Sequence, residues 1–298
     1  MEVSVDGALV DLPDFMIIGA PRCGTTALAY FLSQVSGIAL SSPKEPGFFL
    51  YNGVGPLVRR IVGESVRHGM SWRDYSALFS GMPEGVVKGE ATTWYLRGGL
   101  ETIVNIEKIY GARARDVRII VVLRDPIARA WSHYQMARRN GSEDRPAELA
   151  LTEDEISRCL LAGYSPAYDY LGFGVYQKPL RLFRDHFNHV HVIDFAALQA
   201  DFSAVVLDVL RFLSVDGDVD MDTSQRLNAS GTPKGILAGL GHGLIFNPGP
   251  IQRMIRPLVT PRIRALIRWQ FERFIPRKAP SMPDGLRARL SDYYSGFV

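Results

Sequence analysis

The sequence lacks features that several common classes of protein need. It contains two cysteines in 298 residues, Cys23 and Cys159, which form no spaced pair, so a disulfide framework and a four-ligand zinc site are excluded. The longest apolar runs, such as Phe15–Ala20 and Ile119–Leu123, are far shorter than the roughly 20 residues of a membrane-spanning helix. The N-terminus has no basic region of a signal peptide. We therefore expect a soluble, cytoplasmic protein without a metal site.

The chain as a whole also lacks a strong charge of one sign, because 34 Lys and Arg residues stand against 31 Asp and Glu residues. The exception is the segment 251–289, which holds ten Arg or Lys and two acids. Apolar residues recur between its arginines, as in an amphipathic helix with a solvated charged face. The same pattern would suit an anionic membrane surface, a lipid-linked acceptor or an acidic carrier. Nucleic acid is not expected, since no recognised binding fold accompanies the charge.

Apolar strands alternate with helical patterns from residue 14 to about residue 215. Phe15–Ile18 and Val117–Leu123 are too apolar for half-exposed strands, and each leads through a short loop into a helical stretch. Val86–Glu90 and Val190–Phe195 predict two more strands. The alternation predicts an α/β fold, a P-loop-like three-layer sandwich with a central parallel sheet.

The remaining segments complete the expected organisation. Helices are expected over 98–110, 175–187 and 196–213, and a polar surface loop over 140–148. Glycine and proline become dense over 231–250, and a regular pattern returns only in the basic segment. We expect one domain over residues 1–298, in which 236–298 form a helical, basic C-terminal extension.

The loop after the first strand has the composition of an anion site. It reads Gly-Ala-Pro-Arg-Cys-Gly-Thr-Thr from Gly19 to Thr26. Small residues let backbone amides approach an anion, and the amino end of the following helix adds partial positive charge. The Gly-x4-Gly spacing resembles a Walker loop, but Thr25 stands where a kinase-type loop requires lysine, and the cation comes earlier, at Arg22. The loop predicts a phosphate site and disfavours a kinase.

A thiol enzyme is a competing interpretation of the same loop. Cys23 lies at the amino end of the expected helix, where a thiolate is favoured. The phosphatase spacing Cys-x5-Arg requires an arginine at position 29, which is Ala29 here. A nucleophilic cysteine is therefore disfavoured.

Two motifs together resemble the donor site of sulfotransferases that use 3′-phosphoadenylyl sulfate. Residues 17–28, Ile-Ile-Gly-Ala-Pro-Arg-Cys-Gly-Thr-Thr-Ala-Leu, resemble the 5′-phosphosulfate loop of that family. Residues 121–134, Val-Val-Leu-Arg-Asp-Pro-Ile-Ala-Arg-Ala-Trp-Ser-His-Tyr, are similar to its 3′-phosphate motif. The resemblance covers roughly residues 14–235 and implies 3′-phosphoadenylyl sulfate as donor, released as adenosine 3′,5′-bisphosphate. The donor-binding residues that it implies are Arg22, Cys23, Gly24, Thr25, Thr26, Arg124 and Ser132.

A third motif resembles the heparan sulfate type of these enzymes. Residues 42–49, Ser-Pro-Lys-Glu-Pro-Gly-Phe-Phe, are similar to their Lys-Glu-x-x-Phe-Phe stretch, whose glutamate removes the acceptor proton and matches Glu45. A carboxylate within hydrogen-bond reach of an attacking hydroxyl can take its proton. We expect Glu45 as the catalytic base and Arg22 as the catalytic cation, with Glu90 and His133 as the alternative bases.

Departures from the family pattern bear on the acceptor. Arg22 stands where the family usually has lysine, and its guanidinium neutralises oxygens as a planar fork without giving up a proton. Gly47 and Ala91 replace a histidine and a lysine that the heparan enzymes place beside the sugar. These replacements favour another alcohol or phenol as acceptor.

The last expected donor element lies in the segment 227–235, Leu-Asn-Ala-Ser-Gly-Thr-Pro-Lys-Gly, where related enzymes fold a basic loop over the nucleotide. Its candidate residues are Ser230, Thr232, Lys234 and Gly235. The predicted function is direct in-line transfer of a sulfuryl group to a hydroxyl of a small-molecule, glycan or lipid-linked acceptor. A nucleotide-dependent kinase and a non-catalytic nucleotide-binding protein are the alternatives.

Overall fold

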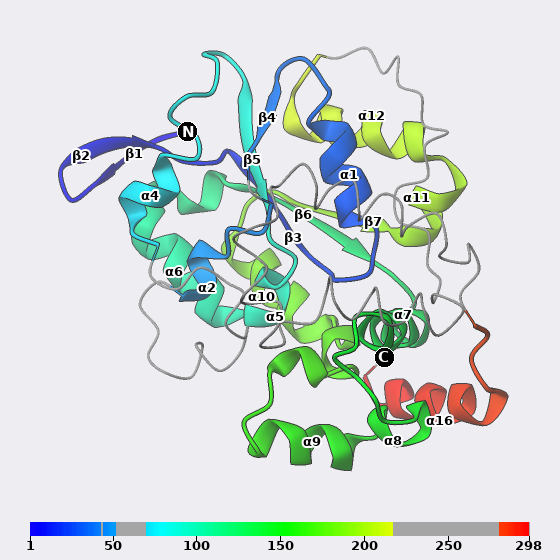
Figure 1. Cartoon of the computed structure of the whole chain (residues 1–298). Helices are drawn as coiled ribbons and strands as arrows, with labels where there is room; N and C mark the ends of the chain where they lie inside the picture. The colour runs from blue at the N-terminus through cyan, green and yellow to red at the C-terminus, as the bar shows by residue number, and fades with distance from the viewer. Residues whose placement is uncertain (43, 52–69, 217–279, 298) are drawn as a thin grey trace, which may run out of the picture.

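A five-stranded parallel sheet forms the centre of the protein (Figure 1). The computed structural model describes residues 1–42, 44–51, 70–216 and 280–297. The strand order is β4-β5-β3-β6-β7, and each neighbouring pair is parallel. The strands are β3 (Phe15–Gly19), β4 (Ile38–Leu40), β5 (Val87–Ala91), β6 (Arg118–Leu123) and β7 (Val190–Asp194). All five residues of β3 are buried, as expected of an apolar strand covered on both faces.

Helices cover both faces of the sheet, so the predicted three-layer α/β fold is confirmed (Figure 1). One face carries α1 (Thr25–Leu32), α11 (Phe195–Ala200) and α12 (Phe202–Leu213). The other carries α2 (Phe48–Tyr51), α4 (Trp72–Ser76), α5 (Tyr95–Gly98), α6 (Leu100–Tyr110) and α10 (Gln177–His186). An antiparallel hairpin that the sequence analysis missed precedes the sheet, formed by β1 (Glu2–Val5) and β2 (Ala8–Asp11).

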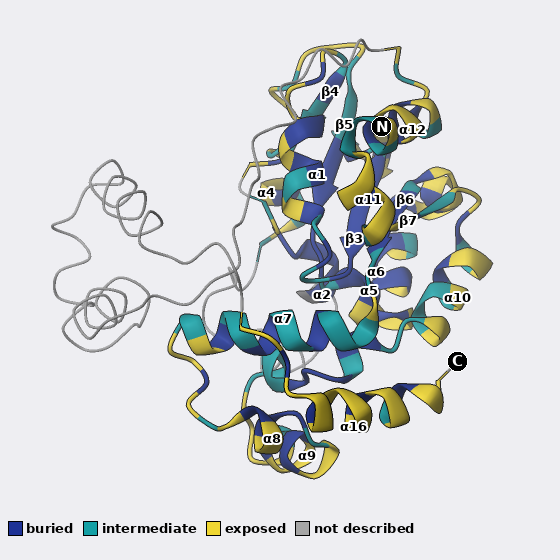
Figure 2. Cartoon of the chain, turned by 90° about the vertical axis from the view of Figure 1, so that its right-hand side faces the viewer, coloured by how far each residue is buried: buried dark blue, intermediate teal, exposed yellow. Residues whose placement is uncertain are grey.

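A second hydrophobic core lies beyond the carboxyl edge of the sheet (Figure 2). It joins α7 (Pro126–Arg139), α8 (Ala147–Ala150), α9 (Glu153–Leu161) and α16 (Asp284–Ser295). The 3-10 helices are η1 (Gly111–Asp116), η2 (Pro166–Tyr168) and η3 (Gly172–Gly174). Leu286 and Leu290 bring α16 into this core, so the described end of the C-terminal extension contacts the helix after β6.

One of the expected helices is divided in the structure and another is confirmed. The helix expected over 98–110 is α6, which begins at Leu100 directly after Gly99, a residue with φ 54 that separates it from the short α5. Asp201 ends α11 and caps α12 by accepting a hydrogen bond from the amide of Ala204 at 2.9 Å. The single-domain organisation stays a prediction, because residues 217–279 lie outside the described part. None of the described helices has the length and apolar character that crossing a membrane requires.

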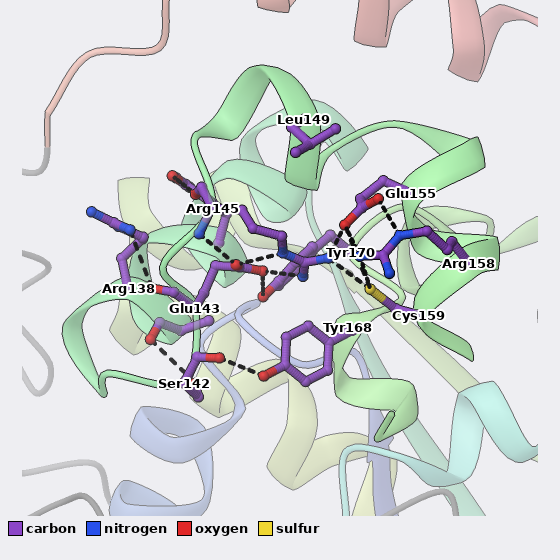
Figure 3. A network of polar contacts seen from close by, with 12 residues as sticks. Arg138, Ser142, Glu143, Arg145, Leu149, Glu155, Arg158, Cys159, Tyr168 and Tyr170 are labelled. Carbon is purple, nitrogen blue, oxygen red and sulfur yellow. Dashed lines mark hydrogen bonds and ion pairs between the residues drawn. The ribbon is translucent and has the colours of Figure 1, made fainter. Parts of the chain in front are cut away.

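The loop expected to be exposed over 140–148 contains a buried carboxylate, so that expectation is wrong at Glu143 (Figure 3). Arg145 places Nη2 at 2.6 Å from Oε2 of Glu143 and Nη1 at 2.6 Å from Oε1 of Glu155. The hydroxyl of Tyr170 donates to Glu143 at 2.9 Å. Burial opposes ionisation of Glu143, but hydrogen bonds from Arg145 and Tyr170 bring its pKa below the usual value. The polar residues of this loop therefore take part in a hydrogen-bond network inside the protein.

Candidate active site

The loop between β3 and α1 has the conformation of an anion-binding turn. Gly24 precedes the helix with φ 85, and a Cβ added there would lie 2.7 Å from Cδ2 of Leu198, so both backbone conformation and space require glycine. Within the described residues no side chain caps the amino end of α1, so the amides of its first turn point to a site that suits an anion. The side chain of Thr25 is buried and that of Thr26 is exposed.

Arg22 connects this loop to α7. Its Nε donates to Oγ of Ser132 at 3.2 Å, and its Nη1 lies 3.3 Å from Sδ of Met136. Arg124, at the end of β6, donates from Nη1 to the carbonyl of Arg22 at 3.3 Å. The fold thus brings together three predicted donor-site residues from two motifs that are far apart in the sequence.

The two arginines of this cluster have no acidic partner in the part of the chain that the structure describes. Within the described residues, neither Arg22 nor Arg124 forms an ion pair. Burial and the charges of Arg139 and Arg124 lower the pKa of Arg22 to about 10, and burial also lowers that of Arg124. Both side chains still carry their charge at neutral pH. Partly buried cations without a carboxylate partner are suited to an anionic ligand.

Cys23 lies in the same loop, but its environment does not favour a thiolate. Its Sγ is 3.9 Å from the hydroxyl of Tyr176. Burial raises the pKa of Cys23 against the opposing charge of Arg129. The structure therefore gives no support to a nucleophilic role for this cysteine.

Glu45 lies at the carboxyl edge of the sheet, beside β5, which pairs with the strand β3 that leads into the loop. Its amide donates to the carbonyl of Ala91 at 3.0 Å, which ties it to the end of β5. Its carboxylate accepts from Nζ of Lys44 at 2.9 Å and from Oγ1 of Thr93 at 3.1 Å. The side chain is 42% exposed, so an acceptor can reach the carboxylate.

Glu90 faces the interior and cannot meet a substrate. Its carboxylate accepts from the hydroxyls of Tyr75 at 2.5 Å, Thr92 at 2.8 Å and Tyr95 at 2.9 Å. Burial raises its pKa to about 7, although these hydrogen bonds favour the ionised form. Of the alternative bases, Glu90 is thus excluded by its position.

The partners of Glu90 hold the segment that carries Glu45. The amide of Gly47 donates to Oγ1 of Thr92 at 3.2 Å, and the amide of Phe49 donates to the hydroxyl of Tyr95 at 3.3 Å. The sequence analysis named Glu90 only as an alternative base and did not predict this support. The distance between Glu45 and Glu90 in the sequence could not reveal it, because these hydrogen bonds join two separate segments of the chain.

His133, the other alternative base, is also buried. Its Nδ1 lies 3.3 Å from Nη1 of Arg129, and burial together with the charges of Arg129 and Arg22 lowers its pKa well below the usual value. A neutral imidazole in this position is a hydrogen-bond partner of Arg129. Arg129 itself is fully buried and was missed by the sequence analysis.

The last predicted donor element lies outside the described residues. This applies to Ser230, Thr232, Lys234 and Gly235, and to most of the basic segment 251–289. Their roles stay predictions.

Comparison with known proteins identifies the family. The sulfotransferase domain matches residues 12–227. The membrane-associated sulfotransferase kil1 of Dictyostelium discoideum is 28% identical over 145 residues, which are 47% of this chain and 27% of that protein. The heparan sulfate glucosamine 3-O-sulfotransferase 3A1 of Mus musculus is 28% identical over 183 residues, 61% of this chain and 40% of that protein. The chain thus spans less than half the length of these curated relatives.

The fold supports the same assignment. A crystal structure of a sulfotransferase from Alicyclobacillus acidocaldarius superposes with a TM-score of 0.63 at 26% identity, covering 88% of this chain and all of that one. The match of residues 12–227 includes the loop after β3, the segment of Glu45 and α7. The chain belongs to the sulfotransferase family whose members use 3′-phosphoadenylyl sulfate.

Proposed function

We propose that this protein transfers a sulfuryl group from 3′-phosphoadenylyl sulfate to a hydroxyl group by direct in-line transfer. The observation that carries the proposal is the meeting of Arg22, Arg124 and Ser132 beside the uncapped start of α1. Two partly buried guanidinium groups that form no ion pair with any described residue fit a donor with phosphate groups at both ends. The residues present therefore suit this nucleotide.

In this proposal each charged side chain has one task. Arg22 neutralises charge that develops on the oxygen bridging sulfur and phosphorus, and so stabilises the transition state more than the bound donor. Arg124 and Ser132 bind the 3′-phosphate. Glu45 accepts the proton of the acceptor hydroxyl as that oxygen attacks sulfur. Cys23 contributes its backbone amide to the loop.

The acceptor is proposed to be an alcohol or phenol of a small molecule, a glycan or a lipid-linked compound. Gly47 and Ala91 remove two side chains that the heparan enzymes use, which favours an acceptor other than heparan. Ser230, Thr232, Lys234 and Gly235 are proposed to close over the 3′-phosphate, and the reaction is proposed to need no metal.

The domain organisation and the cellular compartment are further proposals. We propose one domain over residues 1–298 with a basic extension at 236–298 that contacts an anionic membrane surface or carrier. Both cysteines are free thiols, Cys23 and Cys159, which fits a reducing compartment such as the cytoplasm.

Calorimetric titration tests the donor. Adenosine 3′,5′-bisphosphate should bind without metal, and more tightly than ATP with magnesium, because the site is built around two phosphates and has no Walker lysine. Adenylyl sulfate, which lacks the 3′-phosphate, should bind less tightly than 3′-phosphoadenylyl sulfate, by about tenfold or more if one charge-assisted hydrogen bond is lost. Tighter binding of ATP with magnesium would favour the kinase alternative. Bisphosphate binding without sulfuryl transfer to any acceptor tried would favour the non-catalytic one.

A further inference from the structure

Arg129 is a buried cation that the proposed reaction does not yet use. Its side chain is completely buried, and its Nε has no hydrogen-bond partner among the residues that the structure describes. No carboxylate among the described residues forms an ion pair with it. A buried guanidinium without a counter-charge is costly for the fold, so its presence requires a reason.

The groups that contact Arg129 are neutral. Its Nη2 donates to the carbonyl of Tyr170, and its Nη1 faces Nδ1 of His133 at 3.3 Å. The ring of Phe173 lies 5.8 Å from the guanidinium carbon. Burial raises the pKa of Tyr294 and a hydrogen bond from Arg129 opposes that rise, so this tyrosine of α16 also lies beside the guanidinium. These contacts fix the cation in place without cancelling its charge.

The position of Arg129 connects it to the donor site. It lies one turn before Ser132 on α7, and Ser132 and Met136 on the same helix contact Arg22. The charge of Arg129 also acts on Cys23 and Arg22 of the loop, favouring the thiolate of the former and disfavouring the protonated form of the latter. Arg129 therefore lies close to the contact between the loop and α7.

We propose that Arg129 is a built-in counter-charge for the donor, and that the phosphate groups of the bound nucleotide neutralise its otherwise unpaired positive charge. This inference rests on the proposed function, because it requires an anionic nucleotide in the site. Arg129 acts as a positioning residue through its electric field and without touching the reacting atoms. Because its contacts with Tyr170 and His133 hold the guanidinium in place, its electric field acts on the nucleotide without any rearrangement of the side chain.

The described end of the C-terminal extension takes part in this arrangement. The hydroxyl of Tyr294 donates to the carbonyl of Leu171 at 2.9 Å, next to the Tyr170 carbonyl that accepts from Arg129. A Cβ added at Gly174 would lie 2.6 Å from the Tyr294 hydroxyl, so α16 is closely packed here. Helix α16 thereby helps to seal the cation from water, which strengthens its field at the site.

The experiment compares charge-retaining and neutral variants of Arg129 by calorimetric titration with adenosine 3′,5′-bisphosphate. Arg129→Lys should bind within a few-fold of wild type. Arg129→Gln, which keeps a donor for the Tyr170 carbonyl, should bind at least about tenfold more weakly. Arg129→Met is a second neutral variant, so that one folded neutral protein is enough for the comparison. Arg113→Met removes an exposed arginine from η1 and should leave affinity unchanged, as a control for net charge.

The outcomes separate the inference from the function on which it rests. Weak binding by the neutral variants with near-normal binding by Arg129→Lys supports the counter-charge. Equal affinity in all variants overturns it and leaves the proposed function intact, and so does an equal loss in Arg129→Lys and Arg129→Gln, which would indicate a purely structural role. Wild-type protein that does not bind the bisphosphate would contradict the proposed function and this inference together.

Discussion

At the scale of single residues, the site depends on where each carboxylate lies. Glu45 is exposed at the carboxyl edge of the sheet, whereas Glu90 is enclosed by three hydroxyl groups. The sequence named both as candidate bases, yet only the first can meet an acceptor. Burial therefore separates a candidate base from a supporting residue.

Replacing Glu45 tests the base. Glu45→Gln keeps the shape of the side chain and removes its ability to accept a proton, so kcat should fall about 10²–10⁴-fold. The affinity for adenosine 3′,5′-bisphosphate should stay near that of wild type, since the carboxylate contacts Lys44 and Thr93 and no group of the donor loop. Steady-state kinetics and calorimetry measure the two quantities. Glu84→Gln, at an exposed position, is the matched control, and unchanged turnover in Glu45→Gln would place the base elsewhere.

Replacing Glu90 tests the buried carboxylate through the pH dependence of stability. Its pKa is raised by burial from 4.5 to about 7, so the folded protein holds this proton more tightly than the unfolded chain. Protonated Glu90 therefore contributes to the free energy of unfolding. This contribution is fully present below pH 4.5 and is lost as the pH rises through about 7. Burial holds the pKa values of the neighbouring Tyr75 and Tyr95 well above this range, so they do not titrate within it.

The side chain of the Glu90→Gln variant cannot ionise, so this variant should not lose stability in this way as the pH rises. Relative to wild type, its free energy of unfolding should rise by about 3 kcal/mol between pH 4.5 and pH 8. Urea unfolding at several pH values measures the difference. A constant difference across that range would show that Glu90 has an ordinary pKa in the folded protein.

At the scale of elements, the unit formed by α7, α8, α9 and α16 contains a network of polar contacts around Arg145 (Figure 3). Arg145 is shared by Glu143 from the loop before α8 and by Glu155 from α9. Tyr170 joins this network through its hydroxyl and accepts from Arg129 through its carbonyl. The network therefore supports the loop that fixes the buried cation.

Removing Arg145 should weaken this unit strongly. Arg145→Met leaves Glu143, which is 3% exposed, without its cation, and loss of one partner of a buried pair costs about 3–5 kcal/mol. Arg113→Met breaks the exposed ion pair with Asp116 and should cost less than about 1 kcal/mol. Chemical unfolding of both variants measures the free energies. Equal costs would mean that the network contributes no more than a surface pair.

At the scale of the whole molecule, the cations of the site link ligand binding to folding. Arg22, Arg124 and Arg129 come from the loop after β3 and from the end of β6 and α7, which meet only in the folded protein. The unfolded chain cannot offer this arrangement to a nucleotide. A ligand that neutralises the three charges should therefore raise the stability of the fold.

Adenosine 3′,5′-bisphosphate should raise the melting temperature in the presence of a metal chelator. At a concentration 100 times its Kd, the expected stabilisation is about 2.7 kcal/mol. Adenosine at the same concentration serves as the uncharged control and should have little effect. Differential scanning calorimetry measures the shift, and a shift that appears only when magnesium is added would contradict metal-free binding.

The amino-acid sequence by itself determined the strands, the loop and the helices that carry the site. Phe15–Gly19 with α1, and Arg118–Leu123 with α7, each form from contiguous residues, so their apolar and helical patterns and the short loops between them were visible in order. The strand β4 was missed because it is only three residues long, too short for a pattern. The two motifs also predicted that one donor site contains Arg22, Arg124 and Ser132.

Only the tertiary structure decided which charged residues face the interior. Glu90 meets Tyr75, and Arg129 meets Tyr170 and Tyr294, from segments that the sequence keeps apart. Glu143 lay in a polar stretch that looked exposed for the same reason. Periodicity reports which side of an element is apolar, but the partner that a buried charge finds across the fold depends on how distant elements pack together.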